Sequence, residues 1–378
     1  MSSVGPMGLP GFGHAGSSCF RVETGRLHWP RGWKRCTAHE RKNMKAVTVT
    51  APGGLDRLKV VDLRDPGAPQ AGEIRVRLHA NSINFHDYAV ARGFLPSADG
   101  RVLLADGAGV VDAVGTGVTE FAVGDHVVSG FFPTWHDGPP PIADFSKTPG
   151  DGLDGYAREY VVTPATWFTR APKGFTHAQA ATLTTAGLTA WRALVVEGGM
   201  KAGDTVLVMG TGGVAIFALQ FAKLMGATVI ATSSSDQKLE RAKALGADFT
   251  LNYKSTPEWG GAVRGLTAGL GVDHVVETGG PGTLPQSIIA VRTGGRIALI
   301  GTLTRQAGDL PLSLMMIKNA RLQGVLVGSR RQQQDMVRGI EAGGLKPVVD
   351  KTFGLDAVPD AFRHEESGQH FGKICIEF

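Results

Sequence analysis

The hydrophobic pattern of the chain changes near residue 172, from short alternating runs to longer alternating elements. Before that point, short extended runs separated by turn residues predict strands over 46–49, 58–62, 74–80, 107–114, 125–129 and 156–162, and in 74–80 apolar and polar residues alternate. A polar turn and a brief helix are predicted among them, over 84–92. This part of the chain therefore predicts a β-rich domain.

After residue 172 the pattern predicts helices that alternate with buried strands. Thr176 and Gln179 have the spacing of a capping box, which predicts the start of an alanine-rich helix toward Val196. The strands that follow are predicted at 205–209, 227–232, 249–253, 272–277, 295–301 and 321–327, and the helices at 213–225, 236–245, 258–268 and 283–292. Six strands joined by helical crossovers predict an α/β Rossmann fold, a doubly wound parallel sheet whose ligand lies outside the carboxyl ends of its strands.

Two further segments depart from these patterns. The segment 131–155 contains five prolines and predicts a long irregular loop, and loops of this length are often functional. Residues 331–378 contain one predicted polar helix near 332–342 and predicted strands near 348–353 and 373–376, which indicates a return to the first domain. We therefore predict a β-rich domain over 44–171, a dinucleotide-binding domain over 172–330 and a C-terminal return into the first domain over 331–378.

Residues 1–43 are rich in Gly, Pro, Ser and Arg and show neither the period of a strand nor that of a helix. We predict a disordered N-terminal extension ahead of a folded body that starts near Met44, so its deletion is expected to leave the melting temperature nearly unchanged. A transit peptide is the alternative, although the prolines and glycines oppose the amphipathic helix that such peptides use.

Composition excludes two classes of partner. The formal net charge is +5, and residues 1–43 account for it with seven basic and two acidic residues, so the rest of the chain is balanced and no nucleic acid partner is expected. No apolar run approaches the ~18 residues of a membrane span, which predicts a soluble protein without a membrane partner. The three cysteines, Cys19, Cys36 and Cys375, are too scattered for a disulfide framework or a C-x2-C zinc site, so we predict a reducing compartment, the cytoplasm.

The stretch 204–215 carries the clearest chemical signal. A predicted strand ends at Met209, and Gly210, Gly212 and Ala215 fit the pattern G-x-G-x-x-G/A at the start of a predicted helix. Such a turn lets the backbone approach a pyrophosphate, and the helix N-terminus supplies free N–H groups. We therefore predict a dinucleotide site that includes Gly210, Gly212, Gly213 and Val214. A structural glycine turn is the alternative.

The chain resembles the medium-chain dehydrogenase/reductase superfamily over essentially all of 44–378, and its likeness is to the zinc-independent, quinone-oxidoreductase-like branch. The stretches that carry the resemblance are Ser82-Ile-Asn-Phe-His-Asp87, Ala105-Asp-Gly-Ala-Gly109, Val123-Gly-Asp125, Ala186-Gly-Leu-Thr-Ala-Trp191, the 204–215 turn, Lys243-Ala-Leu-Gly-Ala-Asp248 and His370-Phe-Gly-Lys373. The resemblance implies a chaperonin-10-like β domain interrupted by the nucleotide domain, a site in the cleft between them, and a homodimer formed through the nucleotide domains.

The chain departs from the zinc-dependent members of this superfamily. Those members place a Cys where this chain has Asn84, a His where it has Ala105 and a Glu where it has Asp106. Zinc catalysis needs three protein ligands and an open position, so we predict no metal site. Some enoyl-reducing relatives carry a tyrosine where this chain has Leu95, so a mechanism through that tyrosine is not expected.

The resemblance also implies the remaining residues of the site. Asn84 is expected to line the nicotinamide cleft, with a helix-capping turn as its alternative, and Asp87 is expected to be structural. His86 is the first candidate proton donor and His136 the second, while Trp135 with its neighbouring phenylalanines is expected to wall an apolar substrate pocket. The other cofactor-binding residues expected are Thr189, Gly279, Thr302, Val327 and Lys373.

We predict NADP(H) as the cofactor. An NAD enzyme usually carries an acidic residue at the end of the second strand, and here that strand ends in Ser233 and Ser234. Lys238 and Tyr253 follow, and the spacing between them resembles that of the NADPH-binding Lys and Tyr of quinone reductases. The alternative is that the serines cap the next helix and Lys238 is solvated; Asp236 could also turn toward the ribose.

These expectations converge on a zinc-free, NADPH-dependent reductase that transfers a hydride to an apolar substrate with an activated C=C bond or to a quinone. An alcohol or aldehyde dehydrogenase is the first alternative, and a nucleotide-binding protein without turnover is the second.

Overall fold

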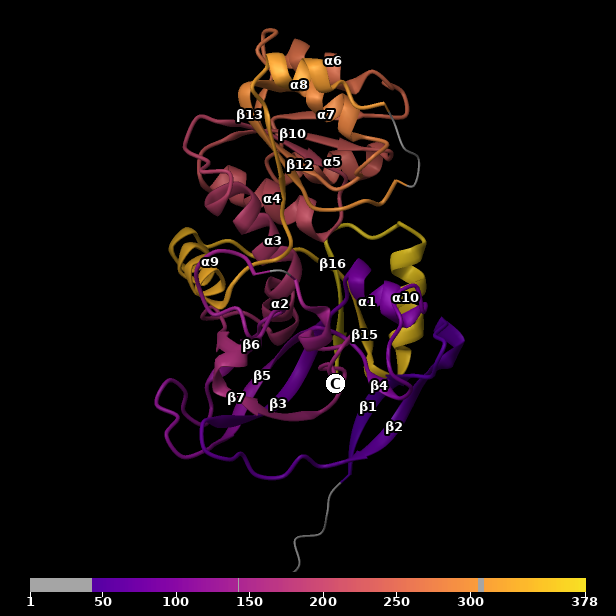
Figure 1. The fold of residues 1–378 in the computed structure, drawn as a ribbon, viewed down its shortest axis with the longest axis vertical. Coiled ribbons are helices and arrows are strands. Elements are labelled where there is room, and N and C mark those ends of the chain that lie inside the picture. Colours follow the sequence, from indigo (N-terminus) through magenta and orange to yellow (C-terminus); the bar gives the residue numbers. More distant parts are fainter. Residues whose placement is uncertain (1–42, 142, 305–308) are drawn as a thin grey trace, which may run out of the picture. The chain divides into compact units, whose positions relative to one another are not determined.

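The computed structural model describes residues 43–141, 143–304 and 309–378 (Figure 1), so the predicted extension over residues 1–43 lies almost wholly outside the described part. The described chain forms two large sheets and one small sheet. The small sheet has the order β2-β1-β4, the mixed sheet has the order β15-β16-β3-β5-β6-β8 with β7 paired to β3, and the parallel sheet has the order β11-β10-β9-β12-β13-β14. All of them belong to one unit, residues 42–378.

The small and mixed sheets contain the short strands of the N-terminal part and the last two strands of the chain. Alternation fixes their faces: in β3, buried Ile74, Val76 and Leu78 point to one side. The strands are β1 Asn43–Val49, β2 Leu58–Arg64, β3 Glu73–Ser82, β4 Arg101–Val102, β5 Asp106–Val114, β6 His126–Ser129, β7 Tyr160–Pro164, β8 Phe168–Arg170, β15 Val349–Gly354 and β16 Lys373–Glu377.

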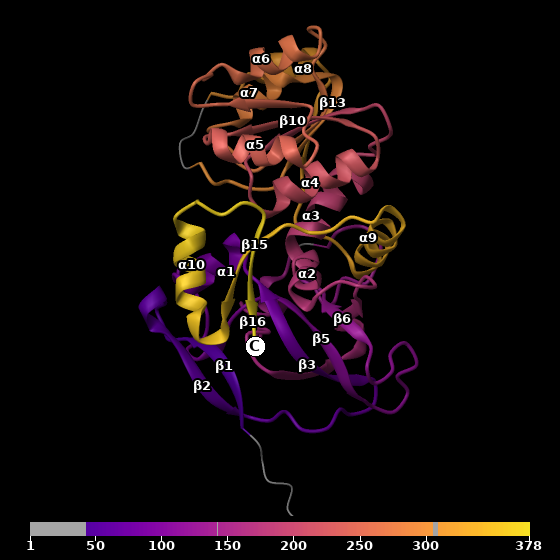
Figure 2. The same cartoon turned by 180° about the vertical axis from the view of Figure 1, so that it is seen from behind.

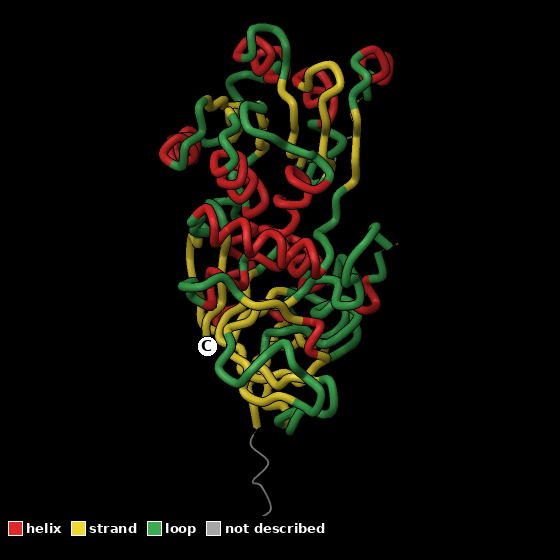
Figure 3. The backbone as a smooth tube through the Cα atoms, turned by 90° about the vertical axis from the view of Figure 1, so that its left-hand side faces the viewer, coloured by secondary structure: helices red, strands yellow, loops and turns green. Residues whose placement is uncertain are grey.

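The parallel sheet has the strand order of a dinucleotide-binding fold, which confirms the predicted fold class. Successive residues of its central strand β9 enter different cores, Val206 and Val208 one and Leu207 and Met209 the other, so helices must cover both faces. Figure 3 shows helices on either side of these strands. The strands are β9 Thr205–Met209, β10 Thr228–Ser233, β11 Phe249–Asn252, β12 Val272–Glu277, β13 Val291–Leu299 and β14 Arg321–Gly324, and the helices are α4 Gly213–Leu224, α5 Asp236–Ala244, α6 Trp259–Leu266, α7 Leu284–Ala290 and α8 Leu312–Ile317.

The helix predicted from Thr176 toward Val196 is not a single α-helix. It starts at the predicted capping box and runs as α2 His177–Ala181, the π-helical turn η4 Leu183–Gly187, α3 Leu188–Trp191 and the π-helical turn η5 Arg192–Val196. π-Helical turns often occur at functional sites. Here η4 directs its residues toward the mixed sheet, as its contacts below show.

The tail contains two helices, whereas the sequence predicted one. The predicted polar helix is α9 Arg330–Gly343, and α10 Val358–Glu366 was missed although a proline stands in its first turn. Figures 1 and 2 show α10 beside the short helix α1 Phe85–Ala91, and the rings of Phe362 and Tyr88 lie 6.3 Å apart. The predicted strand 156–162 is also shifted, since β7 begins at Tyr160.

Candidate active site

A large cavity of about 1770 Å³ lies where the carboxyl ends of the parallel strands face α1 and α10. Its wall includes 14 of the 15 predicted site residues: Asn84, His86, Thr189, Gly210, Gly212, Gly213, Val214, Ser233, Ser234, Lys238, Tyr253, Thr302, Val327 and Lys373. The binding roles of these residues stay predictions, but the structure brings them together. An ordinary small-molecule pocket occupies roughly 300 to 1000 Å³, so this larger cavity leaves room for a dinucleotide and a second ligand.

The glycine turn joins β9 to α4 at the floor of this cavity. Gly210 has a φ of 78°, which a residue with a Cβ rarely adopts, and Gly212 caps α4 without a side chain that would take up its first N–H groups. The C-terminal strand approaches closely: Gly372 N–H donates to Thr211 O over 2.9 Å, and a Cβ on Gly213 would lie 2.4 Å from Lys373 Cδ. The turn therefore presents free backbone donors beside a lysine, as a pyrophosphate site requires.

The end of β10 forms a second part of the wall. Ser233 and Ser234 line the cavity, whereas Ser235 caps α5, so the helix-capping alternative applies to the third serine only. Lys238 Nζ donates to Gly368 O over 2.5 Å. Asp236 accepts a hydrogen bond from Asn252 Nδ2 at 2.7 Å, so its carboxylate is engaged with β11.

Gly279 is the predicted site residue that does not reach the cavity wall. Its N–H donates to Glu277 Oε1 over 2.8 Å, and its carbonyl accepts from both the N–H and the hydroxyl of Thr304. The preceding residue, Thr278, lines the cavity in its place. The strand end closes onto its own loop here, which the glycine pair does not reveal, and the cofactor-binding role of Gly279 stays a prediction.

Asn84 is the centre of a buried hydrogen-bond network. Its Nδ2 donates to Asp106 Oδ2 over 2.9 Å and to Asp87 Oδ2 over 3.0 Å, and its Oδ1 accepts from Lys373 Nζ at 2.6 Å. Thr185 completes the network by donating to Asp106 Oδ1 over 2.6 Å. Both Nδ2 protons and the Oδ1 of Asn84 are thus engaged inside the protein at the N-cap position of α1, and its role beside a nicotinamide stays a prediction.

Burial governs the charges of this network. It raises the pKa of Asp87, and it raises the pKa of Asp106 to about 7, while the ammonium of Lys373 acts in the opposite direction on both. Asp87 also accepts the N–H groups of Asn84 and Ala105, which supports the expectation that it is structural. One ammonium thus acts on two buried carboxyl groups, and burial favours the protonated form of each.

His86 stands at the apolar end of the cavity. Its ring stacks on Phe145 with centroids 5.2 Å apart and meets Phe131 edge-on at 5.4 Å. Its Nε2 lies 3.3 Å from Asp151 Oδ2 but makes no hydrogen bond with a described residue. Phe131, Phe132 and Trp135 line the same end, as expected for a substrate wall, and the exposed His136 does not reach the cavity.

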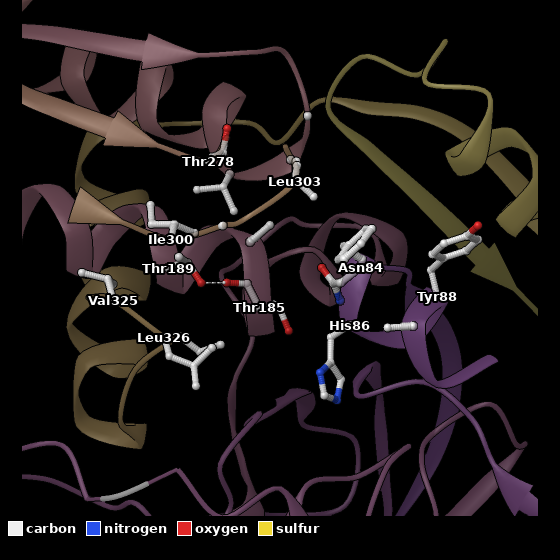
Figure 4. A pocket seen from close by; sticks show the side chains of 18 of the residues that line it. Asn84, His86, Tyr88, Thr185, Thr189, Thr278, Ile300, Leu303, Val325 and Leu326 are labelled. Atoms are coloured by element: carbon white, nitrogen blue, oxygen red, sulfur yellow. Dashed lines mark hydrogen bonds between the residues drawn. The ribbon is translucent and has the colours of Figure 1, made fainter. Parts of the chain in front are cut away.

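Two threonines of the interrupted helix face the cavity together with α1 (Figure 4). Thr189 donates its hydroxyl to Thr185 O over 2.6 Å, the dashed bond in the figure, and Thr185 donates to Asp106. Both hydroxyl protons are therefore committed inside the protein. Sequence reasoning missed Thr185, because a π-helical turn, not a regular helix, directs it toward β5.

Two family models match the chain. The alcohol dehydrogenase GroES-like domain matches residues 70–173, and the zinc-binding dehydrogenase domain matches residues 213–342. The chain belongs to the medium-chain dehydrogenase/reductase superfamily. Membership in this superfamily confirms the predicted resemblance and the fold of a GroES-like catalytic domain with a Rossmann sheet.

Individual members of the superfamily match this chain over nearly their whole length. A zinc-type alcohol dehydrogenase-like protein of Schizosaccharomyces pombe is 41% identical over 86% of this chain and 96% of its own. The crystal structure of an NAD-dependent alcohol dehydrogenase is 39% identical with a TM-score of 0.81, over 89% and 100% of the two chains. A cobalt- and zinc-bound thermostable alcohol dehydrogenase from Pyrobaculum aerophilum is 28% identical with a TM-score of 0.75, over 89% and 100%.

These relatives show that the chain is an alcohol dehydrogenase-like oxidoreductase, an enzyme of the medium-chain superfamily. The family is one of enzymes, so the predicted alternative of a nucleotide-binding protein without turnover is wrong at the level of the family. In the described ranges, 43–141, 143–304 and 309–378, no helix is long and apolar enough to cross a membrane. The cytoplasmic location stays a prediction.

Proposed function

We propose that this enzyme is a zinc-free, NADPH-dependent reductase of C=C bonds conjugated to a carbonyl, or of quinones. The observation that carries the proposal is the network of Asn84, Asp106, Thr185 and Lys373. It occupies, with hydrogen bonds and an ammonium, two of the three positions at which the zinc-dependent members have metal-binding side chains, and Ala105 at the third position has no metal-binding group.

The residues present do not fit a catalytic zinc. Zinc prefers Cys, His and carboxylate ligands, and among the described residues no group of three His, Cys, Asp or Glu could hold a metal ion. The carboxylate of Asp106 is taken up by Asn84 and Thr185, and Lys373 Nζ contacts Asn84 Oδ1 at 2.6 Å. A dication placed among these groups would meet an ammonium and lack thiolate or imidazole donors. We therefore propose no role in this chain for the metal that the Pyrobaculum aerophilum relative binds.

The residues do fit a dinucleotide. The glycine turn would hold the pyrophosphate, the Thr302 and Val327 strand ends would hold the nicotinamide, and Lys238 with Ser233 and Tyr253 would hold a 2′-phosphate. When bound, such a cofactor supplies a hydride to the substrate. An ammonium has three N–H groups, and Lys373 uses two of them on Ile83 O and Asn84 Oδ1, which leaves one to face a ligand oxygen.

The chain's own residues would act mainly by positioning. Asn84 cannot donate to a substrate while its amide is fully engaged, so its role in this proposal is to orient the Lys373 ammonium. His86 Nε2 lies 3.3 Å from Asp151 Oδ2, which would orient the ring at the apolar end, and the imidazole would donate to the carbonyl oxygen of the substrate as charge develops there. The surrounding Phe131, Phe132 and Trp135 would exclude water from the same region.

The deciding experiment measures NADPH oxidation with a panel of enones and quinones, and NADP- or NAD-dependent oxidation of simple alcohols, before and after a strong chelator. We expect enone or quinone reduction that survives chelation. Asn84→Ala should lower kcat about 10- to 100-fold without abolishing turnover, because it loosens one positioned group. Loss of activity on chelation with recovery on adding zinc would refute the zinc-free mechanism.

The alternative of an alcohol dehydrogenase is supported by the names of the relatives, including the NAD-dependent structure at 39% identity. Faster alcohol oxidation than enone reduction in the same panel would favour it. Which of the two nicotinamide cofactors is used is tested below through Lys238.

A further inference from the structure

Glu365 stands on the buried face of α10, at a position where the helix pattern predicts an apolar residue. The buried residues Val358, Ala361 and Phe362 mark that face, and Glu365 continues it at a spacing of i+7 from Val358. It also lies in the last turn of the helix, where the helix dipole disfavours a negative charge. Packing and the dipole both oppose this residue, so its presence needs another explanation.

Glu365 is one of the residues that line the active-site cavity, and one oxygen of its carboxyl group is buried without a hydrogen-bond partner among the described residues. This oxygen, Oε2, is inaccessible to solvent. The next residue differs in this respect. Glu366 accepts the hydroxyl of Tyr88 at 2.8 Å and lies 3.8 Å from Arg92, so its charge is compensated at the rim.

The charges that face Glu365 come from two elements. Lys373 of β16 favours its charged form and Asp87 of α1 opposes it, and burial outweighs both, raising the pKa of Glu365 to about 7. The other charged groups next to α10 have partners of their own: Asp350 of β15 bonds to His364 and Arg241, and Asp56 pairs with Arg363. Glu365 is therefore a carboxyl group that interacts with the charge of Lys373 but whose Oε2 makes no hydrogen bond with a described residue.

We propose that Glu365 exchanges the proton that the reduction consumes, between solvent at the rim and the interior of the cavity. This proposal rests on the proposed function. The hydride forms a C–H bond at the β-carbon, and the electron pair of the C=C bond moves toward the carbonyl oxygen. The carboxyl O–H of Glu365 then breaks, its proton passes through a water of the cavity, and a C–H bond forms at the α-carbon. Solvent returns a proton to the carboxylate, which Lys373 stabilises in the meantime.

The test compares Glu365→Gln, which keeps the shape but cannot release a proton in this way, with Glu365→Asp, which keeps a carboxyl group. Asp360→Asn is the matched control, since it removes a carboxylate from the exposed face of the same helix. We expect kcat to fall about 100-fold in Glu365→Gln, the lower limit for loss of a general acid, and to recover partly in Glu365→Asp. The Michaelis constant for NADPH should stay unchanged.

The pH profile separates a proton-exchanging role from a structural one. Wild-type kcat for reduction should decline as the pH rises through about 7, because the protonated carboxyl is lost, and Glu365→Gln should lack this decline. A Gln variant with wild-type kcat and a wild-type pH profile would overturn the proposal. The same would follow if His86→Gln, and not Glu365→Gln, removed the decline.

A stability measurement tests the state of Glu365 without turnover. A carboxyl whose pKa is higher in the folded than in the unfolded chain stabilises the fold below its unfolded value and loses that contribution as the pH rises through its folded value. As the pH rises from 4.5 to 7, the melting temperature of Glu365→Gln should therefore increase relative to that of the wild type. Asp360→Asn should show no such gain. If no substrate of the panel is reduced but this gain is found, the proposed function fails while the titration of Glu365 stands. If the gain is missing, Glu365 is not the titrating group and the proposal fails.

Discussion

Lys238 is the residue on which the choice between the two nicotinamide cofactors depends. It lines the cavity beside Ser233 and Tyr253, and its ammonium is held by Gly368 O at 2.5 Å. A 2′-phosphate would gain a charge-assisted hydrogen bond there, which the ribose hydroxyl of NADH would not. We expect Lys238→Ala to raise the Michaelis constant for NADPH about 10-fold, the effect of about 1.4 kcal/mol, and to change that for NADH less than about 2-fold.

The control for this prediction is Lys243→Ala, an exposed lysine in the last turn of the same helix. Kinetics with both cofactors at saturating second substrate give the answer. An equal rise for NADPH and NADH would mean that Lys238 supports the fold of the loop at Gly368 and does not bind phosphate.

Single residues were predictable from the sequence where a local signal fixed them. Gly210 and Gly212 were found because a strand, a glycine turn and the start of a helix follow one another directly. The role of Asn84 was only half predictable, since its partners Asp106 and Lys373 lie 22 and 289 positions away. Hydrogen-bond partners at such separations are set by how β3, β5 and β16 pair, and composition and spacing carry no information on that pairing.

Helices and strands, like single residues, were predictable where a local signal in the sequence fixed them and not where distant contacts did. The strands of the parallel sheet were predicted within a few residues because most of them, such as β9, are short apolar runs bounded by turn residues. The π-helical turns, α8 and α10 were not predicted. Helical periodicity does not distinguish a π-helical turn, which contains one inserted residue, from a regular helical turn. The apolar face of α10 ends in Glu365, and this charged residue breaks the pattern by which such a helix is recognised.

The end of α7 depends on one buried lysine from the turn after α8. Lys318 Nζ donates to Ile288 O, Ile289 O and Val291 O over 2.8, 2.7 and 2.7 Å and so satisfies carbonyls that the helix leaves free. Because hydrogen bonds from a charged donor are lost and buried carbonyls are left unpaired, Lys318→Met should lower the free energy of unfolding by about 2–4 kcal/mol. Urea unfolding checks this, with the exposed Lys254→Met as control. A loss of only about 0.5 kcal/mol, the usual size for an exposed substitution, would mean that water replaces the ammonium.

The start of α2 docks on the mixed sheet through three histidines, which predicts a pH dependence. His177 stacks on His79 and on His126, with centroids 4.6 and 4.9 Å apart, and its Nε2 lies 3.0 Å from His126 Nδ1. Burial, with smaller contributions from the other two rings, lowers the pKa of His177 to about 4. The unfolded chain therefore binds this proton first, and stability should be lost as the pH falls from about 6.5 to 4.

Melting temperatures across that range test the expectation. His177→Gln should lose less stability than the wild type on acidification, whereas the exposed His136→Gln should follow the wild-type curve. Identical curves for all three proteins would exclude the histidine stack as the origin of any acid sensitivity.

At the scale of the whole molecule, the edge of the parallel sheet at β14 is open in one chain. β14 pairs only with β13 among the described strands. The neighbouring α8 exposes Leu312, Met316 and Ile317, whose accessible fractions are 64%, 72% and 70%. An open strand edge and a cluster of exposed apolar side chains are both unfavourable in water, and a second copy of the same chain would cover both at once through a twofold contact. We therefore propose that the enzyme is a homodimer through this edge.

Light scattering on the purified protein should give twice the chain mass of 39.8 kDa. Replacing Met316 and Ile317 together by glutamate places two charges in the proposed contact, so the double variant should elute as a monomer at micromolar concentration. The matched control is Leu270→Glu, an exposed apolar residue in the loop before β12, which should stay dimeric. A wild-type monomer would refute the proposed dimer. A double variant that remains a dimer would show that the contact lies elsewhere on the molecule, because two buried and unpaired carboxylates would destabilise the proposed interface too strongly for it to persist.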